Sequence, residues 1–153
     1  MKRIESFCVD HTKISEGIYT SRRDGDIVTY DIRMVKPNTP PFLPNAAIHT
    51  IEHLFATYVR NSRFSENIIY FGPMGCRTGF YLIVRDVSPE DVIALTQETF
   101  HFIAVYTGGI PGNTEIECGN YLEHDLEGAK RFAAEMSGKL EGYTVTELQY
   151  IQT

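Results

Sequence analysis

Two histidines, His49 and His53, lie four residues apart in the chain, and Glu52 directly precedes the second of them. In an α-helix, side chains four positions apart lie on one face, so the two imidazoles would point in the same direction. Such a pair can bind one metal ion, and a carboxylate beside it can carry protons. The competing interpretation is a chance pair of hydrogen-bonded core histidines, and the rest of the chain has to decide.

Three cysteines, at positions 8, 76 and 118, are the other reactive side chains. Their odd number and wide spacing argue against a disulfide framework, so we expect reduced thiols. A catalytic metal site usually has three protein ligands, and either Cys76 or Cys118 would join the histidines. The other cysteine would remain a thiol near the metal, where a cation favours the thiolate. Gly75 and Gly79 flank Cys76, and we expect them to allow close approach to a ligand and positive φ angles.

The helix that carries the two histidines is predicted by its apolar stripe and by the prolines before it. Pro37, Pro40, Pro41 and Pro44 form a stiff connector that is neither a helix nor a central strand. Asn45 follows them and is the expected N-cap of the helix. The apolar face of that helix consists of Ile48, Ile51, Leu54, Phe55, Tyr58 and Val59.

Alternating and β-branched runs predict the strands of a sheet. In residues 26–35 apolar side chains alternate with polar ones, so one face is core and the other carries charge. Residues 65–72 and 78–86 are rich in β-branched and aromatic side chains, as strands are. On the polar face, Arg33 is either a surface arginine, solvated or paired with Asp31, or a clamp for an anion or hydroxyl group.

The remaining segments predict two more helices and two terminal strands. Ser88 and Asp125 are expected to cap helices, the second of which covers residues 126–140. Residues 4–11 and 143–151 are expected to be short strands at the two ends. Because hairpins and helices are mixed rather than repeated as strand-helix units, we expect an α+β fold with an antiparallel sheet.

Length and charge narrow the classes of protein. A chain of 153 residues fits one domain with a core of its own. The net charge of −6 and the lack of a polybasic run argue against a nucleic-acid partner. No apolar segment approaches the ~20 residues of a membrane helix, and the first residues contain no hydrophobic signal core. We therefore expect a cytoplasmic protein with no membrane contact.

Three motifs in the chain resemble the S-ribosylhomocysteine lyase (LuxS) family. They are HTIEHLFATYVRN, PMGCRTGFYL and ECGNYLEHDLEGAK, in that order, and IESFCVDHTK and YDIRMVKPN also match. The resemblance covers about residues 4–135. Before PMGC, many members have Asp-Ile-Ser, whereas this chain has Tyr70, Phe71 and Gly72, so no substrate role is assigned there.

The resemblance implies a fold, an assembly and a set of site residues. The fold would be a single domain over residues 1–153, of the LuxS/MPP-like metallohydrolase type. The protein would be a homodimer with its sites at the interface, and it would bind Fe²⁺, with zinc or cobalt as substitutes. The implied residues are His49, His53 and Cys118 for the metal, Cys76 and Glu52 for catalysis, and Ser6, His11 and Arg33 for the substrate.

The implied reaction cleaves S-ribosylhomocysteine to homocysteine and 4,5-dihydroxy-2,3-pentanedione, the precursor of a quorum-sensing signal. Migration of the carbonyl group along the ribose makes the C4 proton acidic, and β-elimination then expels homocysteine. One alternative is an inverted-zincin-type metallopeptidase, because His-x-x-Glu-His from His49 to His53 also fits that arrangement. Another is a non-enzymatic metal-binding domain whose site is closed by a fourth protein ligand.

Overall fold

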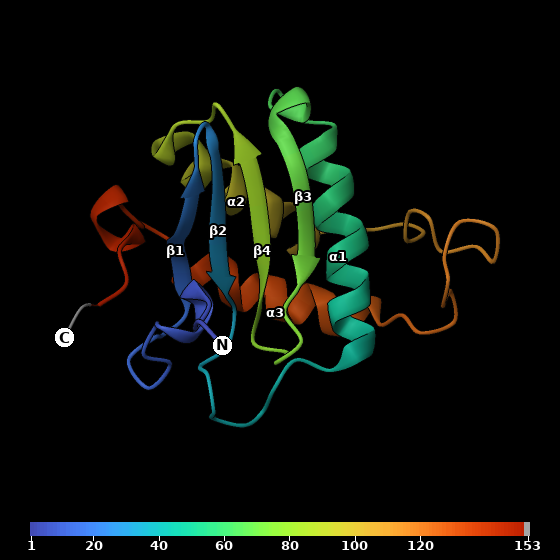
Figure 1. The fold of residues 1–153 in the computed structure, drawn as a ribbon. Helices are drawn as coiled ribbons and strands as arrows, with labels where there is room; N and C mark the ends of the chain where they lie inside the picture. Colours follow the sequence, from blue (N-terminus) through green and yellow to red (C-terminus); the bar gives the residue numbers. More distant parts are fainter. Residues whose placement is uncertain (152–153) are drawn as a thin grey trace.

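The predicted strands form one antiparallel sheet in the computed structural model, which describes residues 1–151. Their order across the sheet is β1-β2-β4-β3, so two hairpins lie side by side and are joined by the pairing of β2 with β4 (Figure 1). Gly25, at φ 64°, takes the left-handed conformation that the first hairpin turn favours. The strands are β1 (Gly17–Asp24), β2 (Ile27–Arg33), β3 (Ile68–Pro73) and β4 (Gly79–Arg85).

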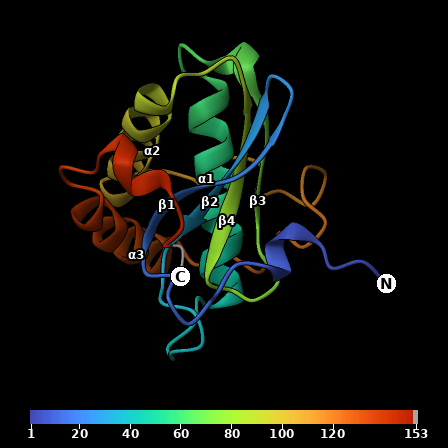
Figure 2. The same ribbon diagram turned by 60° about the vertical axis from the view of Figure 1, so that its left-hand side comes forward.

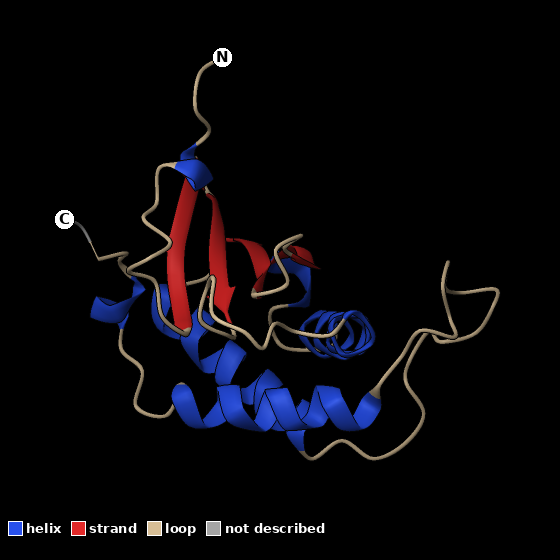
Figure 3. Ribbon diagram, turned by 90° about the horizontal axis from the view of Figure 1, so that it is seen from below, coloured by secondary structure: helices blue, strands red, loops and turns tan. Residues whose placement is uncertain are grey.

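The helices cover one face of the sheet. Helix α1 (Asn45–Arg60) runs along β3, while α2 (Pro89–Ala104) and α3 (Leu126–Lys139) pack against each other and against α1. Figure 3 shows the helices on one side of the sheet and the N-terminal segment on the other. Residues 1–151 thus form a single α+β domain, as predicted. Within them, no helix combines the length and the apolar character needed to cross a membrane.

The core lies between the sheet and the helices. Tyr30 and Ile32 of β2 are fully buried on the helix side, as the alternation predicts. At the centre, Phe55 of α1 stacks on Phe71 of β3 with ring centroids 3.9 Å apart, and it meets Phe100 of α2 edge-on at 5.3 Å. This aromatic cluster fixes the position of α1, and hence of its histidines, against the sheet.

Two of the predicted helix caps are confirmed and one is wrong. The side chain of Ser88 accepts a hydrogen bond of 3.1 Å from the backbone N–H three residues on, and Asp125 accepts an equivalent bond of 2.9 Å. Asn45 is not the N-cap of α1 but its first residue, and Pro44, extended at ψ 144°, takes the cap position without a side-chain bond. The inner face of α3 and the residue after it are buried: Ala129, Phe132, Ala133, Met136 and Leu140.

Neither terminal segment is a strand, contrary to the prediction. The first contains the short 3-10 helix Glu5–Phe7 and the last contains the 3-10 helix Val145–Leu148. Near the C-terminus, Thr144 and Glu147 form a reciprocal capping box, in which the Glu147 carboxylate accepts from the Thr144 N–H at 2.8 Å. Such local bonds satisfy the backbone and compete with pairing to a sheet.

The N-terminal segment lies over one end of the sheet face away from the helices (Figure 2), and residues of both terminal segments line a small cavity on that face. Asp31 and Arg33 lie on this face, as predicted, yet they are only 1% and 2% exposed. His11 from the N-terminal segment and Tyr150 from the C-terminal segment line the same small cavity as this pair. The interpretation of Arg33 as a solvated surface residue is therefore wrong, because segments distant in sequence close over it.

Replacement of Phe55 by alanine tests the aromatic cluster. The ring is fully buried, so the variant should lose about 3–5 kcal/mol of unfolding free energy. Val105, which is 59% exposed, is the control, and Val105→Ala should change stability by less than about 0.5 kcal/mol. Urea unfolding followed by circular dichroism measures both values. Similar losses in the two variants would contradict the assignment of Phe55 to the core.

Candidate active site

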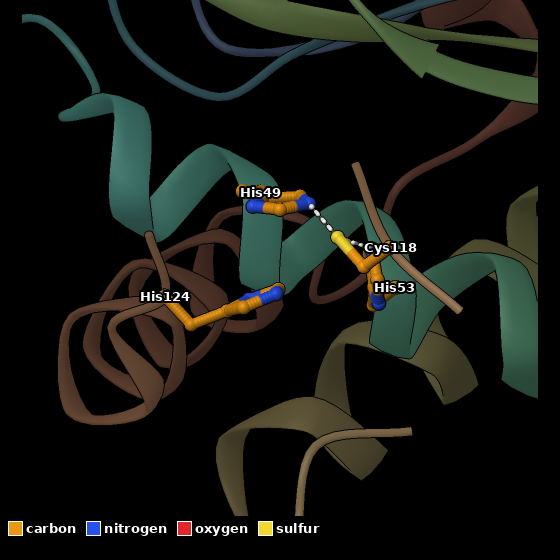
Figure 4. A group of neighbouring side chains, drawn as sticks. All are labelled: His49, His53, Cys118 and His124. Atoms are coloured by element: carbon orange, nitrogen blue, oxygen red, sulfur yellow. Dashed lines mark hydrogen bonds between the residues drawn. The ribbon is translucent and has the colours of Figure 1, made fainter. Parts of the chain in front are cut away.

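Four side chains from two separate regions of the chain converge on one point (Figure 4). His49 and His53 project from α1, and Cys118 and His124 come from the long connection between α2 and α3. One ligand atom from each of the four lies within 4.8 Å of every other. The predicted trio of His49, His53 and Cys118 is thus brought together, and a fourth group joins it.

Hydrogen bonds to the outer ring nitrogens orient the two helix histidines. Nδ1 of His49 lies 2.7 Å from the carbonyl oxygen of Glu123, and Nδ1 of His53 lies 2.8 Å from that of Pro111. A carbonyl oxygen can only accept, so each Nδ1 carries the proton and each Nε2 keeps its lone pair. Both Nε2 atoms face the sulfur of Cys118, at 3.3 and 3.9 Å. Metal-binding histidines are commonly held in this way.

The connection that supplies these carbonyls is largely irregular and projects to the side of α1 (Figure 1), where its carbonyls contact the two histidines. Thr50 of α1 anchors its end, because its hydroxyl oxygen accepts a hydrogen bond of 2.9 Å from the N–H of Asp125. The N–H of Cys118 in turn donates to the carbonyl of Thr114 at 3.0 Å, which forms the local turn that presents the sulfur. Backbone contacts therefore position Cys118 in a segment without helix or strand.

His124 is a site residue that the sequence prediction missed. Thr50 donates its hydroxyl proton to the Ala46 carbonyl, so Nδ1 of His124, 3.0 Å away, must donate to Thr50. Nε2 of His124 therefore carries a lone pair, and it is buried without a hydrogen-bond partner. Burial, together with the nearby His49 and His53, lowers the pKa of His124 to about 4. The available signal was its position six residues after Cys118 in the same segment.

The donor set fits a metal ion of intermediate softness. A thiol sulfur and uncharged imidazole nitrogens are the ligands that zinc and iron(II) take in proteins. Nε2 of His124 is buried without a hydrogen-bond partner among the described residues, as suits a nitrogen that faces a bound group. The chance-pair interpretation of the two helix histidines is therefore much weaker than the metal interpretation.

A second cluster, here called the thiol group, consists of Cys76 in the turn between β3 and β4 together with Thr78, Arg33 and Asp31. The Cys76 sulfur lies 3.0 Å from Oγ1 of Thr78 and accepts from Nη1 of Arg33 at 3.8 Å. Nη1 of Arg33 also donates to Thr78 at 2.8 Å, and the other side of the guanidinium pairs with Asp31 at 2.6 Å. This geometry suits a proton carrier or a nucleophile.

The glycines around Cys76 do not act as predicted. Neither Gly75 nor Gly79 has a positive φ angle, and the strained position is instead Arg77, at φ 60°. A Cβ atom at Gly79 would lie 2.2 Å from the carbonyl oxygen of Ile32 in the neighbouring strand. The glycine is thus required for the close approach of β4 to β2, which brings the Cys76 turn against Arg33, rather than for approach to a ligand.

The three predicted substrate residues line one cavity on the outer face of the sheet. Ser6, His11 and Arg33 are joined there by Asp31 and Tyr150. The cavity has a volume of only about 10 Å³, which is room for about one water molecule. The structure therefore brings these residues together, but in this single chain it does not open a space for a substrate among them.

The thiol group and the metal cluster lie toward the same end of the molecule (Figure 1). The N–H of Leu43, just before α1, donates to the carbonyl of Arg77 at 3.0 Å, which ties the Cys76 turn to the start of that helix. Glu52 is half-buried on α1 between the two histidines, and its side chain makes no hydrogen bond with any of residues 1–151.

Comparison with known proteins confirms the resemblance seen in the motifs. A family model described as S-ribosylhomocysteinase (LuxS) matches residues 4–146. The S-ribosylhomocysteine lyase of Phocaeicola vulgatus is 49% identical over 98% of this chain and 98% of its own. That of Clostridium acetobutylicum is 44% identical over 98% and 99%, and that of Borreliella burgdorferi is 51% identical over 85% and 87%. The chain therefore belongs to the S-ribosylhomocysteinase (LuxS) family.

Proposed function

We propose that this protein is a metal-dependent S-ribosylhomocysteine lyase, which releases homocysteine and 4,5-dihydroxy-2,3-pentanedione. Membership of the family supports the reaction class. The observation that carries the proposal is the pairing of a metal-type cluster at His49 and His53 with a separate thiol, Cys76, held against Arg33. A peptidase would need the cluster but would leave that thiol group unused.

His49, His53 and Cys118 would hold the metal, which we expect to be Fe²⁺ with zinc or cobalt as substitutes. When bound, the metal supplies Lewis acidity, which polarises sugar oxygens and favours the enediol forms through which a carbonyl migrates. Three protein ligands leave a position for the substrate, as catalytic sites require. The neutral Nε2 of His124 then offers an acceptor for a substrate hydroxyl group beside the three ligands.

Cys76 and Glu52 would move the protons. Each carbonyl shift removes a proton from one carbon and returns one to its neighbour, and the final elimination needs a base at C4. Nη1 of Arg33 donates to the Cys76 sulfur at 3.8 Å and can hold it in place for such a transfer. Ser6, His11 and Arg33 are the proposed contacts to the ribose and homocysteine portions of the substrate.

The protein is proposed to act as a homodimer with its sites at the interface. Large apolar side chains are exposed on the N-terminal segment, on β3 and on the connection between α2 and α3. A second copy of the chain could bury them. The side chains are Phe7 at 65%, Tyr70 at 50%, Ile116 at 98% and Leu122 at 80% exposed.

We also propose a cytoplasmic location, a LuxS/MPP-like type of fold and a role of the product in signalling. All three cysteines are free thiols, which suits the reducing cytoplasm. The antiparallel sheet with helices on one face suits the proposed LuxS/MPP-like type of fold. The pentanedione product would serve as the precursor of a quorum-sensing signal.

The structure bears differently on the two alternative functions, a metallopeptidase and a non-enzymatic metal-binding domain. The inverted-zincin-type metallopeptidase is not supported, because the groups that join His49 and His53 are a cysteine and a histidine rather than a carboxylate. A structural metal domain would have its site closed by a fourth protein ligand, and His124 is the residue that could close it. The role of His124 thus separates the lyase from the non-enzymatic alternative.

The function is tested by following homocysteine release from S-ribosylhomocysteine with a thiol reagent. Metal-loaded wild-type protein should release it, and Cys76→Ala should reduce the rate at least about 100-fold, since a proton-transfer group is lost. The variant should keep its metal, because Cys76 is outside the cluster. Cys8→Ala, which removes an exposed thiol, is the control. Full activity in Cys76→Ala, or no release by the wild-type protein, would contradict the proposal.

The metal content of two variants distinguishes a site with three protein ligands from a site with four. After reconstitution with zinc and gel filtration, His53→Ala should retain far less than one metal ion per chain, since one of three ligands is missing. His124→Ala should retain about one ion per chain, because the three ligands remain. Elemental analysis beside the wild-type protein gives both numbers. Equal depletion of the two variants would indicate a closed four-ligand site and favour the structural alternative.

A further inference from the structure

A phenol from the C-terminal segment contacts the buried ion pair behind the thiol group. The hydroxyl of Tyr150 donates to Oδ2 of Asp31 at 2.7 Å, the same oxygen that receives Nη2 of Arg33 at 2.6 Å. Nε of Arg33 donates to Oδ1 of Asp31 at 3.1 Å, so the pair is bidentate. Nη1, on the opposite side of the guanidinium, reaches Thr78 and the sulfur of Cys76.

We propose that Tyr150 is a positioning residue for the reaction at Cys76. Through Asp31, it holds the guanidinium of Arg33 in the one orientation that directs Nη1 at the sulfur. The inference rests on the proposed function, in which Cys76 carries protons. It assigns to the C-terminal segment a role in the chemistry beyond covering the sheet.

The chain of contacts gives this role a physical basis. A planar guanidinium bound at two nitrogens to one carboxylate can turn only if the carboxylate turns with it. Asp31 is 1% exposed, so protein atoms rather than bulk water must hold its oxygens. Because Tyr150 shares Oδ2 with Arg33, it limits rotation of the carboxylate about its side-chain bonds.

The hydroxyl of Tyr150 also moderates the charge next to Arg33. Burial and the nearby Asp31 carboxylate raise the pKa of Tyr150, so the phenol remains protonated and can only be the donor in this contact. A donor on Oδ2 draws negative charge away from the guanidinium. More of the positive charge of Arg33 is then available to the sulfur 3.8 Å away.

The C-terminal segment is well anchored for such a role. The ring of Tyr150 stacks on Tyr19 of β1 with centroids 4.9 Å apart and planes 11° apart. Leu148 is buried at 1% exposure, and the hydroxyl of Tyr143 bonds both the N–H and the carbonyl of Ile18, at 3.0 and 2.6 Å. Removal of the Tyr150 hydroxyl alone should therefore leave the segment in place.

Tyr150→Phe is the variant that tests the proposal, because it removes the hydroxyl and keeps the stacked ring. Tyr143→Phe is its matched control, since it removes a partly buried hydroxyl of the same segment that bonds only backbone atoms. Two readouts apply to the metal-loaded proteins. One is kcat and KM for homocysteine release, and the other is the rate at which iodoacetamide alkylates Cys76 at pH 7, followed by mass spectrometry of the Cys76 peptide.

Tyr150→Phe should lower kcat about tenfold with KM changed by less than about twofold, as for a lost interaction in the chemical step. Alkylation of Cys76 should slow about threefold or more, because Nη1 of Arg33 would no longer be directed at the sulfur. Tyr143→Phe should lower the urea midpoint and leave both rates within about twofold of wild type. Wild-type rates in Tyr150→Phe, or equal losses in both variants, would overturn the positioning role.

The two readouts, homocysteine release and Cys76 alkylation, test the proposed function and this inference separately. If the wild-type protein released no homocysteine, the lyase function would fail. The alkylation rates would still decide the inference, because they report on the sulfur and need no substrate. A slower rate in Tyr150→Phe alone would support the contact chain, and equal rates in all three proteins would overturn it.

Discussion

The candidate site depends on one constraint, which is that each outer imidazole nitrogen of the cluster is already bound to another protein atom. Backbone carbonyls of Glu123 and Pro111 take the Nδ1 protons of His49 and His53, so both Nε2 lone pairs must point inward. Those carbonyls belong to the connection between α2 and α3, which also supplies Cys118. The irregular connection is therefore what converts two helix histidines into a metal-type site.

The reactive thiol depends on a comparable arrangement on the other face of the sheet. Strand β2 carries Asp31 and Arg33 outward, and both ends of the chain close over them. The absence of a side chain at Gly79 lets β4 approach β2 closely enough for Cys76 to meet the guanidinium. Burial makes this ion pair sensitive to every partner it has, because an unmatched charge in such a place is costly.

Local features could be predicted from the sequence, and long-range ones could not. The histidine spacing, the apolar stripe of α1 and the capping residues Ser88 and Asp125 act within one or two helical turns, so their patterns are visible in the chain. His124 follows no such period and joins the cluster only because Thr50 holds the connection in place. Burial of Arg33 likewise results from segments distant in sequence, which periodicity cannot indicate.

The central claim is that inward-facing histidine nitrogens and the Cys118 sulfur hold a metal. X-ray absorption spectroscopy of the zinc-loaded protein tests this claim most directly. We expect one sulfur at about 2.3 Å from the zinc and imidazole nitrogens at about 2.0–2.1 Å from it. We also expect a further oxygen or nitrogen ligand whose signal changes when S-ribosylhomocysteine is added. A spectrum without sulfur, or one that the substrate leaves unchanged, would contradict the claim.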